Sequence, residues 1–302
     1  MTAARVWVAQ RMLKWRQCIA MLAYLIEGHK LRVATMMAGW LLSAGAVVVA
    51  QNPAVSGQAA SLNDSLLARA SLLYDSTAKS GLHGFDCEVH PDWNTLMASA
   101  RKVASIPADD PKLMLLSGVR ITVHVRMNDG SSMDWRMAEG AAKPADAAMQ
   151  AMLERTHRGI EQMLLGVIKL WIPLVDGSVA ESLGDEDVSI TQSADVYTLR
   201  SKDKNNTLTE EFDKGLLLKH FIARDTGSTV DIEPAFANKP RGLLLIGFKA
   251  HVRADKAQET SEMRVGIEYA TSGVYQIPSK IDAELVGEAK FSFALDGCRA
   301  NP

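Results

Sequence analysis

The sequence lacks the short motifs that mark common enzyme and metal sites. It contains no G-x-S-x-G, H-E-x-x-H, C-x-x-C or phosphate-loop pattern, no internal repeat and no low-complexity tract. The acidic run G-D-E-D at 184–187 lacks the alternating spacing of a calcium loop, so we interpret it as a solvated acidic loop. We therefore expect no catalytic residue, no metal and no cofactor. A Ser-His-Asp site assembled from distant residues stays open, because such sites are defined by geometry.

Cysteine is scarce, with three residues in the whole chain. Cys18 lies in a basic leader, which leaves Cys87 and Cys298 alone in the rest of the sequence. Two cysteines in an oxidising compartment most simply form one disulfide, and we predict this pair. The bond would tie the start of the domain to its last strand. No cysteine follows a leader cleavage site, so we predict no bacterial lipid anchor.

Charge is absent from residues 33–50, which follow the basic residues Lys30 and Arg32. A basic flank, an apolar run and a small residue at its end predict a secretory signal cut before Gln51. The run is also long enough to be an uncleaved membrane anchor, and a buried core helix is the third alternative.

The basic segment 1–32 is then a leader or a cytoplasmic tail, with Met21 and Met36 as alternative starts. Positive charge stays on the inner side of a membrane, so residues 51–302 are expected to be exported. We predict a periplasmic or cell-envelope protein, with attachment to the inner membrane if the segment is not cleaved.

The exported part is acidic. It holds 27 basic and 34 acidic residues, a net charge of −7, whereas the whole chain carries −2. An acidic body without a basic stripe argues against nucleic acid as a partner. Residues 51–60 show no clear structural pattern, and we interpret them as a linker. We assign residues 61–302 to a single domain.

Apolar residues recur at spacings of three and four in several segments, which predicts helices. Three helices are expected. The first begins at Ser61, and the second is capped by Asn94 and runs through Met97 to Val103. The third covers 145–171, with Pro144 before it and Pro173 after it. The apolar stripe of the longest one carries three methionines and a histidine: Met149, Met152, Met163 and His157. We interpret the methionines as core rather than as a ligand lining, and His157 as a hydrogen-bonded core residue.

The rest of the domain has the pattern of β-strands. Apolar and polar residues alternate over 119–127, N-D-G at 128–130 predicts a turn, and 131–137 continues as a hairpin partner. From Val196 onward nearly every segment reads as a strand, and short links imply antiparallel neighbours. The predicted fold is α+β. It is a large curved antiparallel sheet (half-barrel) of seven to nine strands, covered on one face by helices and preceded by the signal or transmembrane helix.

Reactive residue types gather in G-L-H-G-F-D-C-E-V-H-P-D-W at 81–93. In an extended strand His83 and Cys87 would lie about 13 Å apart, too far to share one zinc ion. In such a strand His83, Phe85, Cys87 and Val89 point to one side, and Leu82, Asp86, Glu88 and His90 point to the other. We predict Phe85 and Val89 in the core, Cys87 in the disulfide, and a turn at Pro91 and Asp92. The stretch is therefore expected to be a structural strand.

The later strands resemble the outer-membrane lipoprotein carrier (LolA-like) and lipoprotein-sorting superfamily. The resemblance rests on Y-T-L-R-S at 197–201, E-F-D-K-G-L-L-L at 211–218 and G-V-Y-Q-I-P-S-K at 273–280, and it covers mainly residues 180–300. It implies an exported half-barrel closed by helices, with a cavity for the acyl chains of a lipoprotein or lipid. The long helix and the cysteine pair depart from the family pattern, and no cavity arginine can be matched.

We expect a non-catalytic protein that binds a lipid or acyl chain between the sheet and its helices. The alternatives are a structural or partner-binding module with a filled core, and an exported hydrolase with a non-local site. A polar cleft beside His90, His220 or His251 would favour the hydrolase. The expected ligand lining consists of inward-facing strand residues: Ile121, Val123, Val125, Ile246, Phe248, Ile267, Tyr269, Phe291 and Phe293.

Overall fold

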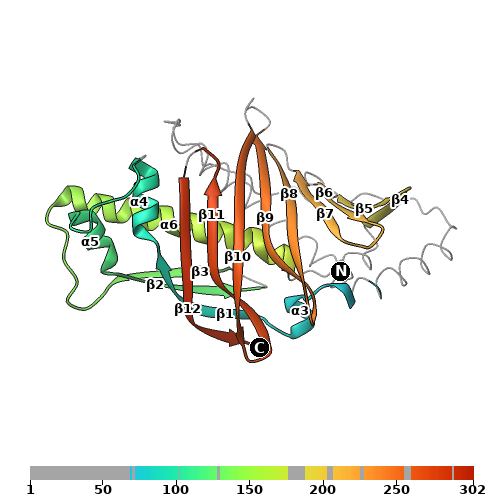
Figure 1. Ribbon diagram of the computed structural model, residues 1–302, viewed down its shortest axis with the longest axis horizontal. Helices are drawn as coiled ribbons and strands as arrows, with labels where there is room; N and C mark the ends of the chain where they lie inside the picture. Colours follow the sequence, from blue (N-terminus) through green and yellow to red (C-terminus); the bar gives the residue numbers. More distant parts are fainter. Residues whose placement is uncertain are drawn as a thin grey trace, which may run out of the picture.

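The structure is a computed structural model of the chain (Figure 1). It describes residues 69, 72–101, 103–127, 130–175, 188–202, 207–224, 228–254, 260–287 and 289–302. The leader, the apolar run 33–50, the linker, most of the helix expected from Ser61 and the acidic loop 184–187 lie outside these residues. No described helix is both long enough and apolar enough to cross a membrane.

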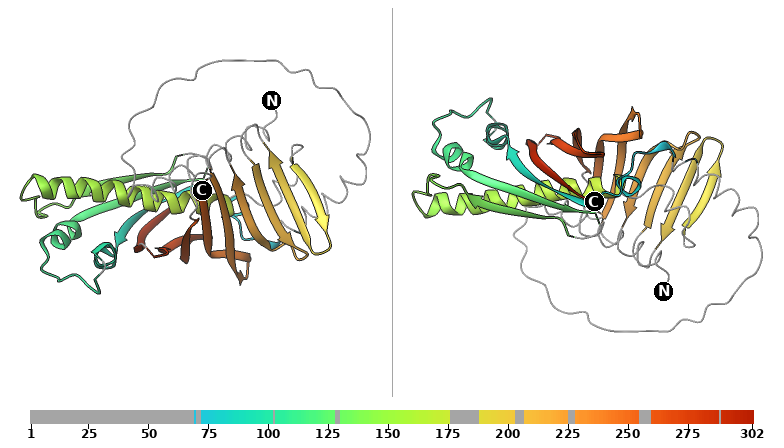
Figure 2. Two further views of the ribbon diagram at one scale, coloured as in Figure 1. Left: turned by 90° about the horizontal axis from the view of Figure 1, so that it is seen from above. Right: turned by 90° about the horizontal axis from the view of Figure 1, so that it is seen from below.

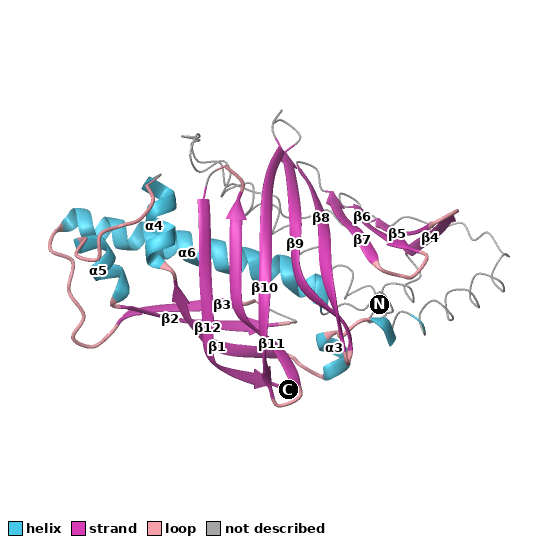
Figure 3. Cartoon of the chain, viewed as in Figure 1, coloured by secondary structure: helices cyan, strands magenta, loops and turns pink. Residues whose placement is uncertain are grey.

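All the described strands belong to one sheet of twelve, in which every neighbouring pair is antiparallel (Figure 3). The order across the sheet is β3-β2-β1-β12-β11-β10-β9-β8-β7-β6-β5-β4. The strands are β1 (Gly84–Pro91), β2 (Val119–Arg126), β3 (Ser132–Met137), β4 (Val188–Ser193), β5 (Val196–Lys202), β6 (Thr207–Asp213), β7 (Leu218–Arg224), β8 (Ser228–Lys239), β9 (Gly242–Ala254), β10 (Thr260–Ser272), β11 (Tyr275–Leu285) and β12 (Ala289–Asn301).

The predicted antiparallel sheet is confirmed, and its open, bent form fits the expected half-barrel (Figure 2). The predicted seven to nine strands are fewer than the twelve in the sheet, and β4 and β8 are among those that the sequence analysis missed. β8 contains Pro234 between Glu233 and Ala235, and a proline argues against a central strand. Its neighbours on both sides nevertheless hold it in the sheet.

β12 joins the two parts of the sheet. It runs beside β11 and then bends to lie along β1, whose strand direction crosses that of β8–β11 (Figure 1). The bend coincides with a bulge, where Gly297 and Cys298 lie opposite the single residue Cys87. Gly297 has φ +58°, a conformation that glycine adopts without a steric penalty. The predicted disulfide between Cys87 and Cys298 is present at this bulge.

The longest helix, α6 (Ala147–Val175), crosses behind β8–β12 (Figure 1). The sequence analysis ended this helix at 171, with Pro173 beyond its end, but Pro173 lies in its last turn. A proline removes one backbone donor, and the burial of the residues around it, Trp171 and Ile172 among them, offsets that loss. At the other end the carboxylate of Asp146 accepts a hydrogen bond from the amide of Met149, as an N-cap does.

Three shorter helices complete the described fold: α3 (Thr77–Ser80), α4 (Trp93–Arg101) and α5 (Pro111–Ser117). The cap of α4 is Asp92, which accepts from the amide and hydroxyl of Thr95, and not Asn94 as predicted. The Asn94 side chain instead bonds the backbone of Ile106. Its Nδ2 donates to the Ile106 carbonyl oxygen, and its Oδ1 accepts from the Ile106 amide. α5, which the sequence analysis missed, is capped by Asp110.

Candidate functional site

Most of the predicted ligand lining lies in the apolar core. Seven of the nine residues are buried and belong to one cluster with the inward-facing residues of α6: Ile121, Val123, Val125, Phe248, Ile267, Phe291 and Phe293. Tyr269 is partly buried, and its oxygen accepts a hydrogen bond of 2.9 Å from Nε1 of Trp171 on α6. Desolvation raises the pKa of the Tyr269 hydroxyl. The sheet face identified from alternation is therefore the face that α6 covers.

Ile246 is a correction to that lining, because 41% of the residue is exposed. A bulge lies between β8 and β9, where Ala235 faces Gly247 but Phe236 faces Leu245. Ile246 is the extra residue of this bulge, so the strict alternation on which its assignment rested breaks at this position. Leu244 and Leu245 are both buried as a result.

Little space remains between the last turn of α6 and the sheet. A cavity of about 20 Å³ lies near the end of α6, lined by Val175 together with Tyr74 and Phe221, among others. That volume suits about one water molecule. Tyr74 closes the region, since its hydroxyl donates to the carbonyl of Leu216 (2.6 Å) and accepts from the amide of Leu218 (2.8 Å). No acyl chain fits this cavity.

The stretch at 81–93 is mainly the structural strand that we expected. Phe85, Cys87 and Val89 are buried, while Glu88 and His90 are exposed on the other side. The expected alternation of sides fails at His83, which is exposed, and at Leu82, which is 2% exposed. The strand begins only at Gly84, so the alternation does not extend back to these two residues.

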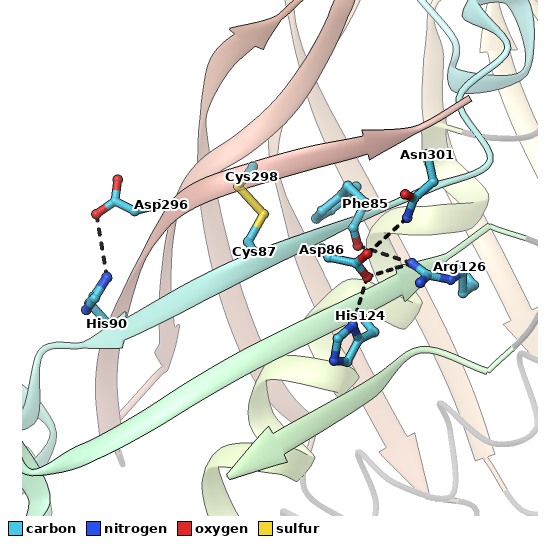
Figure 4. The surroundings of a disulfide bond; sticks show 9 residues. All are labelled: Phe85, Asp86, Cys87, His90, His124, Arg126, Asp296, Cys298 and Asn301. Carbon is cyan, nitrogen blue, oxygen red and sulfur yellow. Dashed lines mark hydrogen bonds and ion pairs between the residues drawn. A yellow bond between two sulfur atoms is a disulfide. The ribbon is translucent and has the colours of Figure 1, made fainter. Parts of the chain in front are cut away.

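A polar cluster on the outer face of β1 and β2 is the first arrangement that could perform chemistry (Figure 4). The carboxylate of Asp86 accepts from Arg126 (2.8 Å) and Asn301 (3.3 Å) and lies 2.8 Å from Nδ1 of His124. Burial alone would raise the pKa of Asp86, but these hydrogen bonds outweigh it and lower the pKa to about 2. The hydrogen bond to Asp86 in turn raises the pKa of His124.

The surroundings of His124 do not suit acid–base catalysis. Its second ring nitrogen, Nε2, lies 3.3 Å from the carboxylate of Asp134, so both nitrogens face carboxylates. Two carboxylates favour the protonated imidazole, and in that form neither ring nitrogen has a lone pair to accept a proton from a nucleophile. Sequence reasoning missed the cluster because Asp86 and His124 are 38 positions apart and meet only through the β1–β2 register.

The three histidines named for a possible hydrolase each lie beside one carboxylate. His90, His220 and His251 lie on the outer side of the sheet beside Asp296 (3.7 Å), Asp231 (3.1 Å) and Glu233 (3.6 Å), respectively. His157 is partly buried and stacks on Trp135 with ring centres 4.8 Å apart, an aromatic contact that the sequence analysis did not foresee. Within the described ranges no group of three or more His, Cys, Asp or Glu residues could hold a metal ion.

A ligand-sized groove does exist, between α4 and the turn that joins β11 to β12. Its volume is about 360 Å³, within the range of small-molecule sites. Its lining is rich in small and apolar residues, with polar groups among them: Asn94, Thr95, Ala98, Ser99, Val103, Ala104, Glu284, Leu285, Gly287, Ala289 and Lys290. No pattern in the sequence predicts this groove, because alanines and glycines in a helix and a turn form no recognisable motif.

Polar groups in the groove already have partners in the protein. The Asn94 side chain bonds the backbone of Ile106, and the Ser99 hydroxyl accepts from the amide of Lys290 (2.9 Å). The ammonium of Lys290 pairs with Glu284 at 3.2 Å. A ligand therefore meets a surface on which few hydrogen-bonding groups remain to be satisfied, and its main contacts would be with the apolar walls.

Comparison with protein-family models, with curated proteins and with solved structures finds no match for this chain. The resemblance to lipoprotein carriers stays a prediction.

Proposed function

We propose that the chain is a non-catalytic protein of the cell envelope that binds a lipid or acyl chain in the groove between α4 and the β11–β12 turn. The observation that carries this proposal is the size of the groove, about 360 Å³, against about 20 Å³ under α6. The ligand still lies between the sheet and a helix, as the sequence suggested, but beside α4 rather than α6. The Cys87–Cys298 disulfide supports an oxidising, exported environment.

Exposed apolar side chains support the same place. Val103, in the groove, is 49% exposed, and Val286, between the lining residues Leu285 and Gly287, is 40% exposed. Exposed apolar residues that gather at a concave site mark binding surfaces more often than scattered ones do. Each methylene of an acyl chain buried here would contribute about 0.8 kcal/mol.

The direct test is native mass spectrometry, with lipid extraction, of the protein purified from its own envelope. We expect a bound species that extracts into organic solvent as a lipid or fatty acid. A protein that carries no lipid and does not bind added dodecanoate would contradict the proposal.

A charged substitution in the groove tests whether the ligand binds there. Val103→Asp introduces a carboxylate into the apolar wall, and we expect at least about tenfold weaker binding of dodecanoate, measured by calorimetry, because the charge must be desolvated. Val274→Asp is the matched control, since Val274 is 64% exposed in the β10–β11 turn outside the groove. Equal affinities for the two variants would place the ligand elsewhere.

The packing of α6 against the sheet favours a second candidate, a structural or partner-binding envelope module. The observation behind it is the small cavity, about 20 Å³, at the end of α6, where apolar residues of the helix and the sheet pack in one cluster. This candidate predicts that the protein purified from its envelope carries no lipid and that Val103→Asp leaves dodecanoate binding undetectable, as in the wild type.

A further inference from the structure

The two edges of the sheet differ in how they are protected. β3, at one edge, carries the exposed charges Asp134 and Arg136, and its Trp135 contacts His157 of α6. Charges on an edge strand and a covering helix both prevent pairing with another chain. This edge is therefore blocked.

β4, at the other edge, has neither protection among the residues that the structure describes. Its sequence, V-S-I-T-Q-S, contains no charge, proline or glycine, and Ser189, Thr191, Gln192 and Ser193 are all exposed. Among the described strands β4 pairs with β5 alone. Alternate residues of an antiparallel strand direct their N–H and C=O groups to opposite edges, so half of the β4 backbone groups face outward. Figure 2 shows β4 at the end of the sheet, away from α6.

The apolar face of the sheet also reaches this edge. Ile190 packs against the core and lies opposite Leu199 of β5, which is 4% exposed. A further strand beside β4 would extend that apolar face and bury more of Ile190.

We propose that β4 pairs with β4 of a second copy of this chain, antiparallel about a two-fold axis, so that two sheets join edge to edge. A second copy fits because this strand brings no like charges together when it meets itself. Centred on Ile190, the pair places Ile190 opposite Ile190 of the other copy and continues the apolar face across the axis. The inference does not depend on lipid binding.

The test is sedimentation of the full-length chain in detergent over a range of concentrations. We expect a dimer in the wild type and at least about tenfold weaker association for Ile190→Lys, because the two introduced charges face each other. Thr191→Lys, at an exposed position, should also weaken the dimer. Thr271→Lys, the same change on an exposed part of β10, should leave it intact.

Mixing complementary variants separates pairing from misfolding. Ile190→Lys and Ile190→Glu should each be monomeric alone and should form a mixed dimer together, since residue 190 then faces an opposite charge. A wild type that stays monomeric at every concentration, or a mixture that does not associate, would overturn the proposal.

Discussion

At the scale of single residues, the network around Asp86 shows how position decides chemistry. An aspartate and a histidine 2.8 Å apart resemble two members of a catalytic triad. Here Arg126 holds the same carboxylate and Asp134 occupies the other side of the imidazole. The group is a set of cross-strand ion pairs that fastens β1 to β2 and β3.

The network should make stability depend on pH. Asp86 has a lowered pKa, so its contribution is present above about pH 4 and is lost as the pH falls toward about 2. His124 has a raised pKa, so its contribution is present below about pH 6.5 and is lost as the pH rises through the raised value. Together they stabilise the fold most between about pH 4 and 6.5.

His124→Gln tests this dependence by urea unfolding at pH 5 and pH 9. We expect the variant to lose on the order of 1 kcal/mol at pH 5, after solvent screening, and much less at pH 9. His83→Gln, at an exposed position just before β1, is the control and should show no such difference between the two values. A loss that is equal at pH 5 and pH 9 would count against the charged form of His124.

At the scale of elements, α6 is held to the sheet chiefly by its last turns. Trp171 packs edge-on against Phe85, with ring centroids 6.0 Å apart, and donates to Tyr269. Most residues from Leu164 to Val175 are buried, whereas Met149, Met152 and Met163 nearer the start are only partly buried. The attachment therefore depends on a few large side chains.

Substitutions at Trp171 should separate packing from hydrogen bonding. We expect Trp171→Ala to cost about 3 to 5 kcal/mol of unfolding free energy, because it leaves a large cavity. Trp171→Phe keeps a ring against Phe85 but removes the hydrogen bond to Tyr269. The loss of that bond should lower the unfolding free energy by about 1 kcal/mol, in addition to any loss from poorer packing. If the bond stabilises the fold, adding Tyr269→Phe to Trp171→Phe should cost little further unfolding free energy, because the bond is already lost. If the costs of the two single variants simply add in the double variant, the bond contributes nothing to stability.

The sequence identified the elements whose own pattern is strong. The period of two in β2 and the apolar stripe of α6 are local signals, and both elements were found. β8 was missed because Pro234 contradicts a strand locally, and only pairing with β7 and β9 keeps it there. Ile246 was misplaced because a bulge is set by the partner strand. The groove and the Asp86 network were missed for the same reason, since each depends on contacts between distant segments.

At the scale of the whole molecule, the disulfide joins residues 211 positions apart at the point where β12 bends onto β1. Cys87→Ser with Cys298→Ser should lower the unfolding free energy by about 2 to 5 kcal/mol, since the unfolded chain regains the freedom of a long loop. Thermal unfolding with and without a reductant measures this. The reductant should destabilise the wild type and leave the double variant unchanged, and a wild type that is insensitive to reductant would contradict the bond.

The place of β1 between β2 and β12 has a consequence for biogenesis. β4 to β12 are joined in chain order, so they can assemble one hairpin at a time as the polypeptide emerges. β1 must wait for its second neighbour until more than two hundred further residues have been made, and pairing across so long a separation is slow. β1 and β2 would thus keep one edge open until β12 has been made, so the closing of the sheet is the last step of folding.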